Sequence, residues 1–328
     1  MSAARRLAFI GLAALCVAAR AEYPEKPITL IVPFSAGSDA DVSARNLAQH
    51  AARYLGSVSI VVSNRPGASG ATGTQAVLQA PPDGYTLLLA RIASQVILPA
   101  TDPKTPYRWS DFTYLGLLEI NPYVCAVRQQ APYRSMSDLI VEVRKHPGGL
   151  KFATVGPGTL QNFGPQYLFS LLGLPRNAAL GVPYKGSGEL ALALTGGQVD
   201  FACSNLGALL PHFRAGSLRA LMTTSREPLK QLPDTPTARR LSWPQMEQLS
   251  AWSALAGPAG LPEEVGARWA GVLARLAADP EWIGTTQAAG SQPAVRAPAQ
   301  TREFVRGQYE LYENLSKQFG LRAPSKRD

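Results

Sequence analysis

The chain has 328 residues, 46% of them hydrophobic, so it can bury a sizeable core and has room for about two domains. Its formal net charge of +9 suits anionic small molecules. Its Lys and Arg residues are scattered, with no dense run before Lys326-Arg327, which argues against a nucleic-acid partner.

The first 21 residues have the three parts of a secretory signal peptide. Arg5 and Arg6 form the basic end, residues 7–19 are apolar, and residues 19–21 form an A-x-A cleavage site. The apolar stretch is too short to span a bilayer. A lipoprotein anchor at Cys16 is disfavoured because a leucine precedes this cysteine. We therefore predict an exported, soluble protein that is cleaved near Ala21.

The stretch Ile28–Arg45 organises the rest of the chain. Residues 28–34 are apolar and β-branched and predict a buried strand, followed by the small residues 35–38. A helix capped by Asp39 or Asp41 follows. A strand–loop–helix junction aims unpaired backbone N–H groups at one point, which attracts carboxylates and other anions. An ordinary strand–helix turn is the alternative.

The next units repeat this plan. We expect strands at 58–62 and 85–90, a loop at 64–70 and a helix at 71–80. This βαβαβ order predicts a parallel sheet with helices on both faces. Ligands of such sheets bind outside the carboxyl ends of the strands, where the two loops and residues 91–94 lie.

The second half of the chain shows the same alternation. The apolar segment 112–127 can carry the chain into a second domain, and the strand 251–256 leads back to the first. Between them we expect strands at 152–155, 182–184, 200–204 and 218–223 and helices at 160–172, 189–195 and after Asn205. Three more helices are expected at 263–278, 280–289 and 299–319. Two similar halves joined by two crossings predict a hinged cleft.

Two cysteines remain after the signal peptide. An oxidising compartment permits a disulfide between Cys125 and Cys203. Each lies in an apolar, strand-like run, so two buried thiols fit equally well.

Catalytic motifs are absent from the sequence. It contains no GxSxG, GxxxxGK[ST], HExxH or CxxC. We interpret His50, His146 and His212 as surface or structural histidines because they lie in polar helical stretches. Asp39 and Asp41 lack further acidic or histidine ligands nearby, so they make a poor metal site. We expect that the protein is not an enzyme and that it uses no cofactor or metal.

Several stretches resemble the periplasmic receptors of tripartite tricarboxylate transporters, often called Bug proteins. They are YPEKPITLIVPFSAG, NRPGASGATG, PDGYTLLLA, FATVGPGT, VPYKGSGE, GGQVDFACSN and the AGSLRAL run, in the family's order. The resemblance implies an α/β, two-domain periplasmic binding protein of the Venus-flytrap kind, type II-like, with the ligand cleft between its domains. The implied limits are 1–21 for the signal peptide, 22–122 with 249–328 for the first domain, and 123–248 for the second.

The resemblance also implies a function. Members of the family are monomeric receptors in the periplasm that pass a small carboxylate to membrane permease subunits without catalysis. An orphan receptor that signals through a membrane sensor, and a secreted enzyme built on the same cleft, are the alternatives.

The resemblance further implies which residues bind the ligand. Backbone amides of the loops at 34–41 and 67–70 would clasp one carboxylate. The loop at 156–159, residues 185–187 and Asn205 would close from the other domain. The implied binding residues are Phe34, Ser35, Ala36, Gly37, Ser38, Asp41, Ala68, Ser69, Gly70, Arg91, Ser94, Gly158, Thr159, Tyr184, Lys185, Gly186 and Asn205. Helix capping is the alternative role for Thr159 and Asn205, and core packing is the alternative for Tyr184.

The sequence departs from the family's pattern at four positions. Ser38 and Ser69 replace usual glycines, Ala40 replaces a hydroxyl residue, and Arg91 stands where a small or hydroxyl residue is common. These departures concern the ligand more than the fold.

The selectivity of the site depends on two opposite charges. We expect Arg91 to point into the cleft and hold a second carboxylate with parallel hydrogen bonds. If Asp39 points inward instead, an amine-bearing ligand gains a partner. In a third arrangement, the two pair with each other at the rim and contact nothing else.

Overall fold

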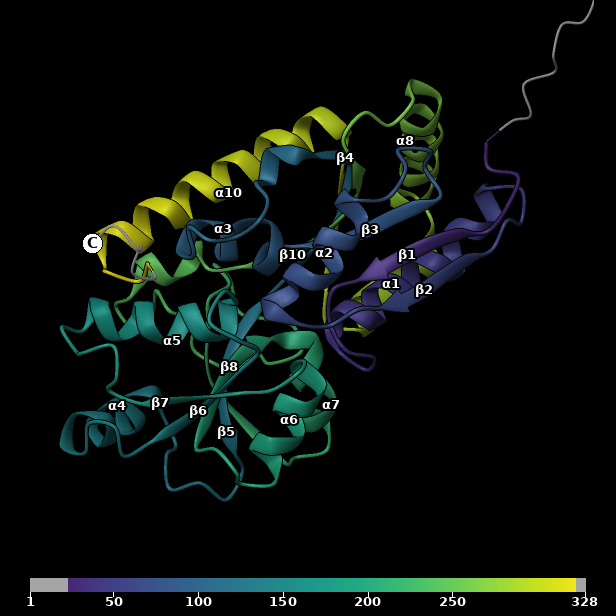
Figure 1. The fold of residues 1–328 in the computed structure, drawn as a ribbon. Helices are drawn as coiled ribbons and strands as arrows, with labels where there is room; N and C mark the ends of the chain where they lie inside the picture. The colour runs from purple at the N-terminus through teal and green to yellow at the C-terminus, as the bar shows by residue number, and fades with distance from the viewer. Residues whose placement is uncertain (1–22, 323–328) are drawn as a thin grey trace, which may run out of the picture.

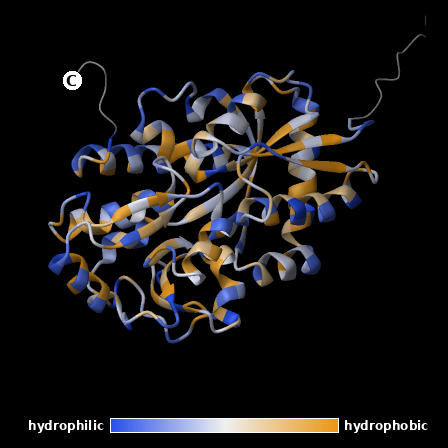
Figure 2. Cartoon of the chain, turned by 60° about the horizontal axis from the view of Figure 1, so that its bottom comes forward, coloured by the Kyte–Doolittle hydropathy of each residue, from blue (hydrophilic) through white to orange (hydrophobic). Residues whose placement is uncertain are grey.

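The computed structural model describes residues 23–322 as two α/β lobes, drawn one above the other in Figure 1. The predicted signal peptide lies outside these residues. In Figure 2 the strands are mostly orange, while many helices alternate blue and orange along their length. This colouring fits helices that bury one face against a sheet and expose the other to solvent.

The upper lobe contains a six-stranded sheet in the order β11-β4-β10-β3-β1-β2. The strands are β1 Ile28–Val32, β2 Ile60–Asn64, β3 Thr86–Arg91, β4 Phe112–Asn121, β10 Ala251–Pro258 and β11 Gln292–Arg296. Strands β1, β2 and β3 are parallel, as predicted. Strand β10 runs antiparallel to β3 and β4, and β11 runs antiparallel to β4. The parallel prediction covered only these three strands, and the whole sheet is mixed because the chain re-enters this lobe in the opposite direction.

The lower lobe contains a five-stranded sheet in the order β7-β6-β8-β5-β9. The strands are β5 Tyr123–Arg128, β6 Lys151–Thr154, β7 Leu180–Pro183, β8 Phe201–Asn205 and β9 Leu218–Thr223. Strand β6 is parallel to β7 and β8, whereas β5 is antiparallel to β8 and β9.

The chain passes between the lobes twice. It leaves the upper sheet at the end of β4 and enters the lower sheet at β5. It returns from β9 to β10 through an irregular segment that holds the short helix η5, Pro244–Gln248. The domain limits at 122/123 and 248/249 lie close to these passages and stay a prediction.

Helices cover the sheets of both lobes. Those of the upper lobe are α1 Asp39–Ala51, α2 Ala71–Leu78, α3 Leu98–Thr101, α8 Glu263–Ala277, α9 Pro280–Ala288 and α10 Pro298–Gln318. Those of the lower lobe are α4 Met136–Lys145, α5 Leu160–Leu171, α6 Ser187–Thr195 and α7 Leu206–Arg214. Short helical turns are η1 Ala52–Tyr54, η2 Ala68–Gly70, η3 Ala93–Ile97 and η4 Trp109–Asp111.

The long helix α10 joins the two lobes. It packs on β4 in the upper lobe and extends over α5 of the lower lobe (Figure 1). There Tyr312 makes an edge-on ring contact with Phe163 at a centroid distance of 5.0 Å. Both rings are buried, so this contact packs apolar surface of the upper lobe against the lower lobe.

Helix α1 begins at Asp39, so both predicted cap residues lie inside the helix. Ser38 is the N-cap residue, and its hydroxyl accepts a hydrogen bond from the Asp41 amide at 3.2 Å. The prediction that Asp39 or Asp41 caps the helix is therefore wrong. Both aspartates lie in the first turn, where negative charge also favours a helix N-terminus, and both carboxylates have other partners.

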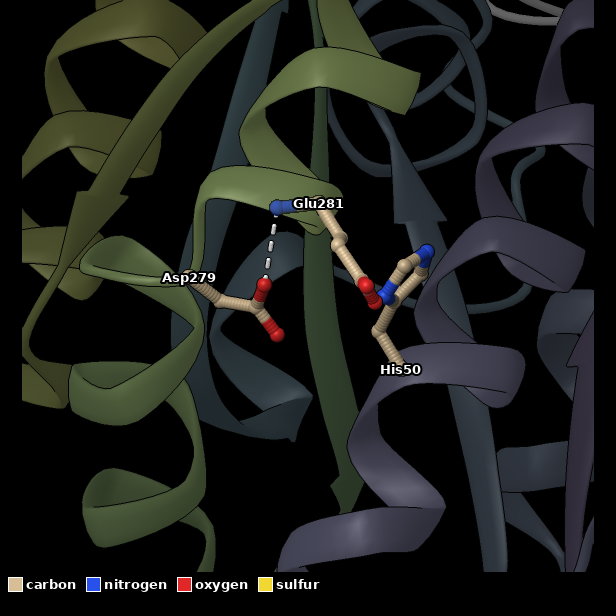
Figure 3. Close-up of side chains that lie close together, drawn as sticks. All are labelled: His50, Asp279 and Glu281. Atoms are coloured by element: carbon tan, nitrogen blue, oxygen red, sulfur yellow. Dashed lines mark hydrogen bonds between the residues drawn. The ribbon is translucent and has the colours of Figure 1, made fainter.

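A polar cluster connects the end of α1 and the turn η1 with the start of α9. His50, Asp279 and Glu281 lie close together in Figure 3, with potential ligand atoms within 4.8 Å of one another. The Arg53 guanidinium lies 2.6 Å from His50 Nδ1, 2.7 Å from Asp279 and 2.7 Å from Glu281. The Arg53 guanidinium therefore supplies the positive charge beside the two carboxylates. His50 has the structural role that the sequence predicts.

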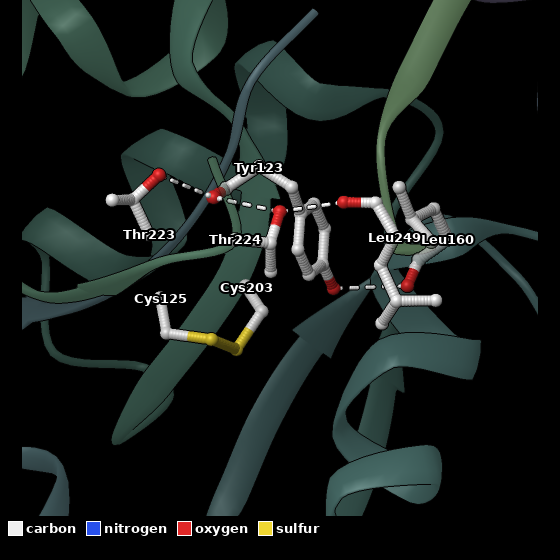
Figure 4. Close-up of a disulfide and its surroundings, with 7 residues drawn as sticks. All are labelled: Tyr123, Cys125, Leu160, Cys203, Thr223, Thr224 and Leu249. Carbon is white, nitrogen blue, oxygen red and sulfur yellow. Dashed lines mark hydrogen bonds between the residues drawn. A yellow bond between two sulfur atoms is a disulfide. The ribbon is translucent and has the colours of Figure 1, made fainter. Parts of the chain in front are cut away.

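A disulfide links two adjacent inner strands of the lower sheet. Cys125 of β5 lies directly opposite Cys203 of β8 in the strand register, and the two sulfurs are bonded (Figure 4). The bridge decides between the two alternatives that the sequence left open. Tyr123, on the same strand, donates its hydroxyl hydrogen to the Leu160 carbonyl at 2.9 Å and so ties β5 to α5.

We predict that removal of the disulfide weakens the lower lobe. The two cysteines are 78 residues apart in sequence. A cross-link over a loop of this length restricts the unfolded chain, so the double variant Cys125→Ala/Cys203→Ala should lose about 2–4 kcal/mol of unfolding free energy. Urea denaturation of both proteins measures the difference. An unchanged midpoint and slope, or rapid labelling of both native cysteines by iodoacetamide, would contradict this prediction.

Candidate functional site

The loop at 67–70 has a strained backbone. Four consecutive residues have positive φ: 136° at Gly67, 46° at Ala68, 55° at Ser69 and 95° at Gly70. Residues with side chains cost roughly 1–2 kcal/mol each in the left-handed region. Strain of this kind concentrates at ligand-binding sites, where the surrounding structure holds it in place. It also explains why glycine suits position 69 better than the serine found here.

This loop offers unpaired backbone donors to a cavity. Among residues 23–322, the amides of Ala68 and Ser69 have no hydrogen-bond acceptor, whereas the Gly70 amide donates to Gly67 at 2.9 Å. The cavity measures about 250 Å³. Its lining is Phe34, Pro66, Gly67, Ala68, Ser69, Gly70, Val155, Tyr184 and Lys185. Loop and aromatic residues from both lobes therefore meet around a space large enough for a small organic acid.

The lower lobe approaches the strained loop closely. Ser69 accepts a hydrogen bond from the Gly158 amide at 3.2 Å. A Cβ added to Gly156 would lie 2.5 Å from the Ser69 hydroxyl, and one on Gly186 would lie 2.2 Å from the Ser35 hydroxyl. Such distances are shorter than real contacts, so a side chain at either place would force the facing serine hydroxyl to rotate. At Gly156 the positive φ of 113° favours glycine as well.

Asp41 stabilises the first loop from within. Its carboxylate accepts hydrogen bonds from the Gly37 amide, Asn64 and Arg45, each at 3.0 Å. Burial alone would raise the pKa of Asp41, but these hydrogen bonds outweigh it and hold the pKa below its usual value. The Gly37 amide, predicted as a ligand donor, already has a partner here.

Asp39 and Arg91 form a buried ion pair where the lobes meet. Arg91 Nη2 lies 2.5 Å from Asp39 Oδ2, and the two side chains are only 4% and 10% exposed. Arg91 lines a cavity between the lobes, but its guanidinium is occupied by Asp39 and Ser253 here, so the expected contact with a ligand carboxylate stays a prediction. The alternative in which the two residues pair is confirmed, but its location at the rim is wrong, because both side chains are buried.

The lower lobe also holds the Asp39 carboxylate. Ser187 donates to Asp39 Oδ1 at 2.6 Å, and Asn205 Nδ2 donates to Asp39 Oδ2 at 2.6 Å. Burial alone would raise the pKa of Asp39, but the charge of Arg91 and the hydrogen bonds from Ser187 and Asn205 lower it. Asp39 is therefore a charged link between the two lobes.

The ion pair continues into a chain of buried polar groups. Arg91 Nη1 donates to Ser253 at 2.5 Å, and Ser253 donates to Glu119 at 2.8 Å. Asn121 donates to Glu119 at 3.2 Å and to Ser291 at 2.6 Å. Ser253, Glu119 and Asn121 were not predicted as site residues. The one available signal was an acidic residue inside the apolar run LGLLEIN.

The remaining predicted residues occupy different positions. Thr159 is fully buried and donates to the Gly156 carbonyl at 2.7 Å, so its side chain does not cap α5. Asn205 precedes α7 but donates to Asp39, so it does not cap that helix either. Tyr184 is half-buried and both packs against the core and lines the cavity. Ser94 lies behind the strained loop, since a Cβ on Gly70 would meet its Cβ at 3.0 Å.

A second, smaller cavity adjoins the cavity of the strained loop. It measures about 20 Å³ and is lined by Ser38, Asp39, Arg91 and Asn205 among others. It shares Phe34 and Val155 with the cavity of the strained loop. Nine of the seventeen predicted residues line one of these two cavities. A further cavity of about 480 Å³ lies on the other side of Asp39, between α1, α6, α7 and α9.

Two lobes that enclose a cavity for a small molecule define the architecture of a bilobal solute-binding protein, and solved structures share it. BugD, a periplasmic binding protein, aligns with a TM-score of 0.85 and 28% identity over 92% of this chain and 99% of that one. MatC from Rhodopseudomonas palustris, solved with malate, aligns with a TM-score of 0.84 and 29% identity over 89% of this chain and 99% of that one. Another R. palustris protein, solved with adipate, aligns at 0.86 and 26% identity over 91% of this chain and 99% of that one.

Sequence comparison identifies the family. The model of the tripartite tricarboxylate transporter family receptor matches residues 43–321. Protein BugT of Bordetella pertussis is 31% identical over 330 residues, covering 98% of this chain and 99% of the relative. The chain belongs to this receptor family. Within residues 23–322, no helix combines the length and hydropathy required to cross a membrane.

We predict that Asp39→Asn destabilises the protein in a pH-dependent way. A folded-state pKa below the ordinary value of 3.8 means that ionised Asp39 stabilises the fold above that pH, and that the contribution is lost as pH falls further. At pH 7 the variant leaves Arg91 buried without its counter-charge, which should cost about 3 kcal/mol. Urea unfolding at pH 7 and pH 3 tests this. The gap between wild type and variant should narrow at pH 3, and an equal gap at both values would contradict the prediction.

Proposed function

We propose that the protein is a monomeric periplasmic receptor that captures a small carboxylate in the cleft between its lobes. In this proposal it delivers the solute to the membrane permease subunits of a tripartite tricarboxylate-type transporter. The observation that carries the proposal is the strained loop at 67–70, whose unpaired amides at Ala68 and Ser69 line a cavity that residues of the other lobe complete.

The chemistry of this cavity suits one carboxylate on an organic chain. Two free backbone N–H groups can donate to the two carboxylate oxygens, as anion-binding concavities of main-chain amides do. Lys185 adds a positive charge from the lower lobe, and Phe34 and Tyr184 offer apolar surface to the rest of the solute. Because these groups belong to both lobes, a bound solute would favour the arrangement in which the lobes meet.

The relatives support the proposal. Malate in MatC and adipate in the second R. palustris protein are both small carboxylates. The family description supports a transporter partner, and the periplasmic relatives support export. In the proposed arrangement, residues 22–122 and 249–328 form one domain and residues 123–248 the other, with the cleft between them.

We predict that carboxylates raise the melting temperature of the mature protein. A ligand that binds only the folded state stabilises it by about 2.7 kcal/mol at 100 times its Kd. For a chain of this size that corresponds to a rise of several degrees. Thermal-shift measurements with mono-, di- and tricarboxylates, sugars and divalent metals test the class of ligand. If a sugar or a metal shifts melting and no carboxylate does, the proposed function is wrong.

We predict that Lys185→Ala weakens carboxylate binding. The exposed ammonium group contributes a screened attraction, so its loss should raise the Kd about three- to five-fold and more at low salt. Isothermal titration with the strongest carboxylate from the thermal screen measures the change. Lys151→Ala, also an exposed lysine of the lower lobe but outside the cavity, is the matched control. Equal affinities for the two variants would remove Lys185 from the site.

A further inference from the structure

The Asp39 carboxylate is held in the way that a receptor holds a bound acid. It projects from the upper lobe and receives hydrogen bonds from Ser187 and Asn205 of the lower lobe, at 2.6 Å each. Arg91 supplies a cation at 2.5 Å. One carboxylate with a guanidinium and two neutral donors, buried between closing lobes, is the arrangement expected for a captured anion. Here the anion belongs to the chain.

The position of this carboxylate matters because it adjoins the proposed ligand cavity. The small cavity beside Asp39, Arg91 and Asn205 shares Phe34 and Val155 with the cavity of the strained loop. A solute held at Ala68 and Ser69 that extends past Phe34 would therefore approach Asp39. The small cavity measures about 20 Å³, which is roughly the space of one water molecule. A second carboxylate has no room there while Asp39 keeps its place.

Charge acts in the same direction as size. Arg91 already contacts Asp39 and Ser253 through its two terminal nitrogens. A second carboxylate in this place would meet the like charge of Asp39 at short range in a buried setting, where repulsion is strong. The Asp39–Arg91 pair is neutral as a whole, so it also offers no net charge to attract an ammonium group.

One buried acceptor beside the pair lacks a partner. Asn205 is 3% exposed, and its Oδ1 atom has no hydrogen-bond partner within residues 23–322. Its Nδ2 group donates to Asp39, which fixes the orientation of the amide and leaves Oδ1 as an acceptor. A buried acceptor without a donor is costly, and a ligand hydroxyl that reached it would remove that cost.

We propose that Asp39 occupies the second anion position of the cleft and thereby selects solutes with a single carboxylate and an uncharged hydrogen-bond donor, such as hydroxy acids, over dicarboxylates. The inference rests on the proposed function, since it assumes that the cleft binds a carboxylate at the 67–70 loop. It makes Asp39 a specificity-determining residue and Asn205 Oδ1 the acceptor for the donor group of the solute.

Matched acids test this inference by isothermal titration of the mature protein. Malate and 3-hydroxybutanoate differ by one carboxylate, as do adipate and 6-hydroxyhexanoate, and butanoate lacks the hydroxyl group. Wild type should bind the monocarboxylate of at least one pair about ten-fold more tightly than its dicarboxylate partner, and 3-hydroxybutanoate more tightly than butanoate or 3-aminobutanoate. Wild type that prefers the dicarboxylate in both pairs would overturn the inference.

Variants assign the selectivity to Asp39. Asp39→Ala should free Arg91 and improve dicarboxylate binding about ten-fold, and Arg91→Ala in the same background should abolish that gain. Asp279→Asn changes a buried aspartate that pairs with Arg53 and lines neither cavity, so it should leave the ratio of affinities unchanged. Circular dichroism checks folding, and Asp39→Ser serves as a second variant if Asp39→Ala is unstable.

The outcomes separate the inference from the proposed function. If carboxylates bind but the ratio of affinities is the same in wild type and in folded Asp39→Ala, the inference is wrong and the receptor function stands. If no acid binds wild type while a sugar or a metal does, the proposed function itself is wrong and the inference falls with it.

Discussion

The buried Asp39–Arg91 ion pair requires partners from several elements of the fold, because a charged group inside a protein must be paired and hydrogen-bonded. Transfer of two ions from water is costly, and only close pairing together with further hydrogen bonds offsets the cost. Here the partners come from the start of α1, the end of β3, the middle of β10, the end of β8 and the start of α6. Elements far apart in sequence are fixed relative to one another because one carboxylate must be satisfied.

The same constraint connects stability with ligand choice. A receptor that closes on an anion needs donors from both lobes, and in this chain some of those donors already hold Asp39. Relatives of the same fold were solved with malate and with adipate, both dicarboxylates. If the proposed role of Asp39 is right, a single acidic side chain changes the number of carboxylates that the cleft accepts while the backbone of the fold stays the same.

The local features of the sequence were sufficient for most elements. Strand β1, helix α1 and the loop at 67–70 were predictable because hydrophobic periodicity and turn residues act over a few neighbours. The cap of α1 was mispredicted because Ser38 competes with two aspartates, and the choice depends on partners such as Arg91 that lie elsewhere. The direction of β10 could not be predicted from the sequence either, since its residues pair with partners 130 or more positions away.

The site shows the same division between local and long-range information. The family resemblance indicated the loops, and the strained backbone at Ala68 and Ser69 agrees with a loop that usually carries glycine. The pairing of Asp39 with Arg91 was one of three arrangements that the sequence allowed, because both residues lie at one sheet edge. Their burial depends on Ser187 and Asn205 arriving from the other lobe, and no local pattern reports that contact. The disulfide was undecided for the same reason, as it required the register between β5 and β8.

The most direct test of these conclusions is a crystal structure of the protein with its bound acid, obtained with the acid that co-purifies or with the tightest acid from titration. We expect one carboxylate against the amides of Ala68 and Ser69, an uncharged donor near Asn205 Oδ1, and Asp39 still paired with Arg91. A ligand carboxylate bound to Arg91, with Asp39 displaced from it, would contradict the central claim that the chain itself supplies the second anion of the cleft.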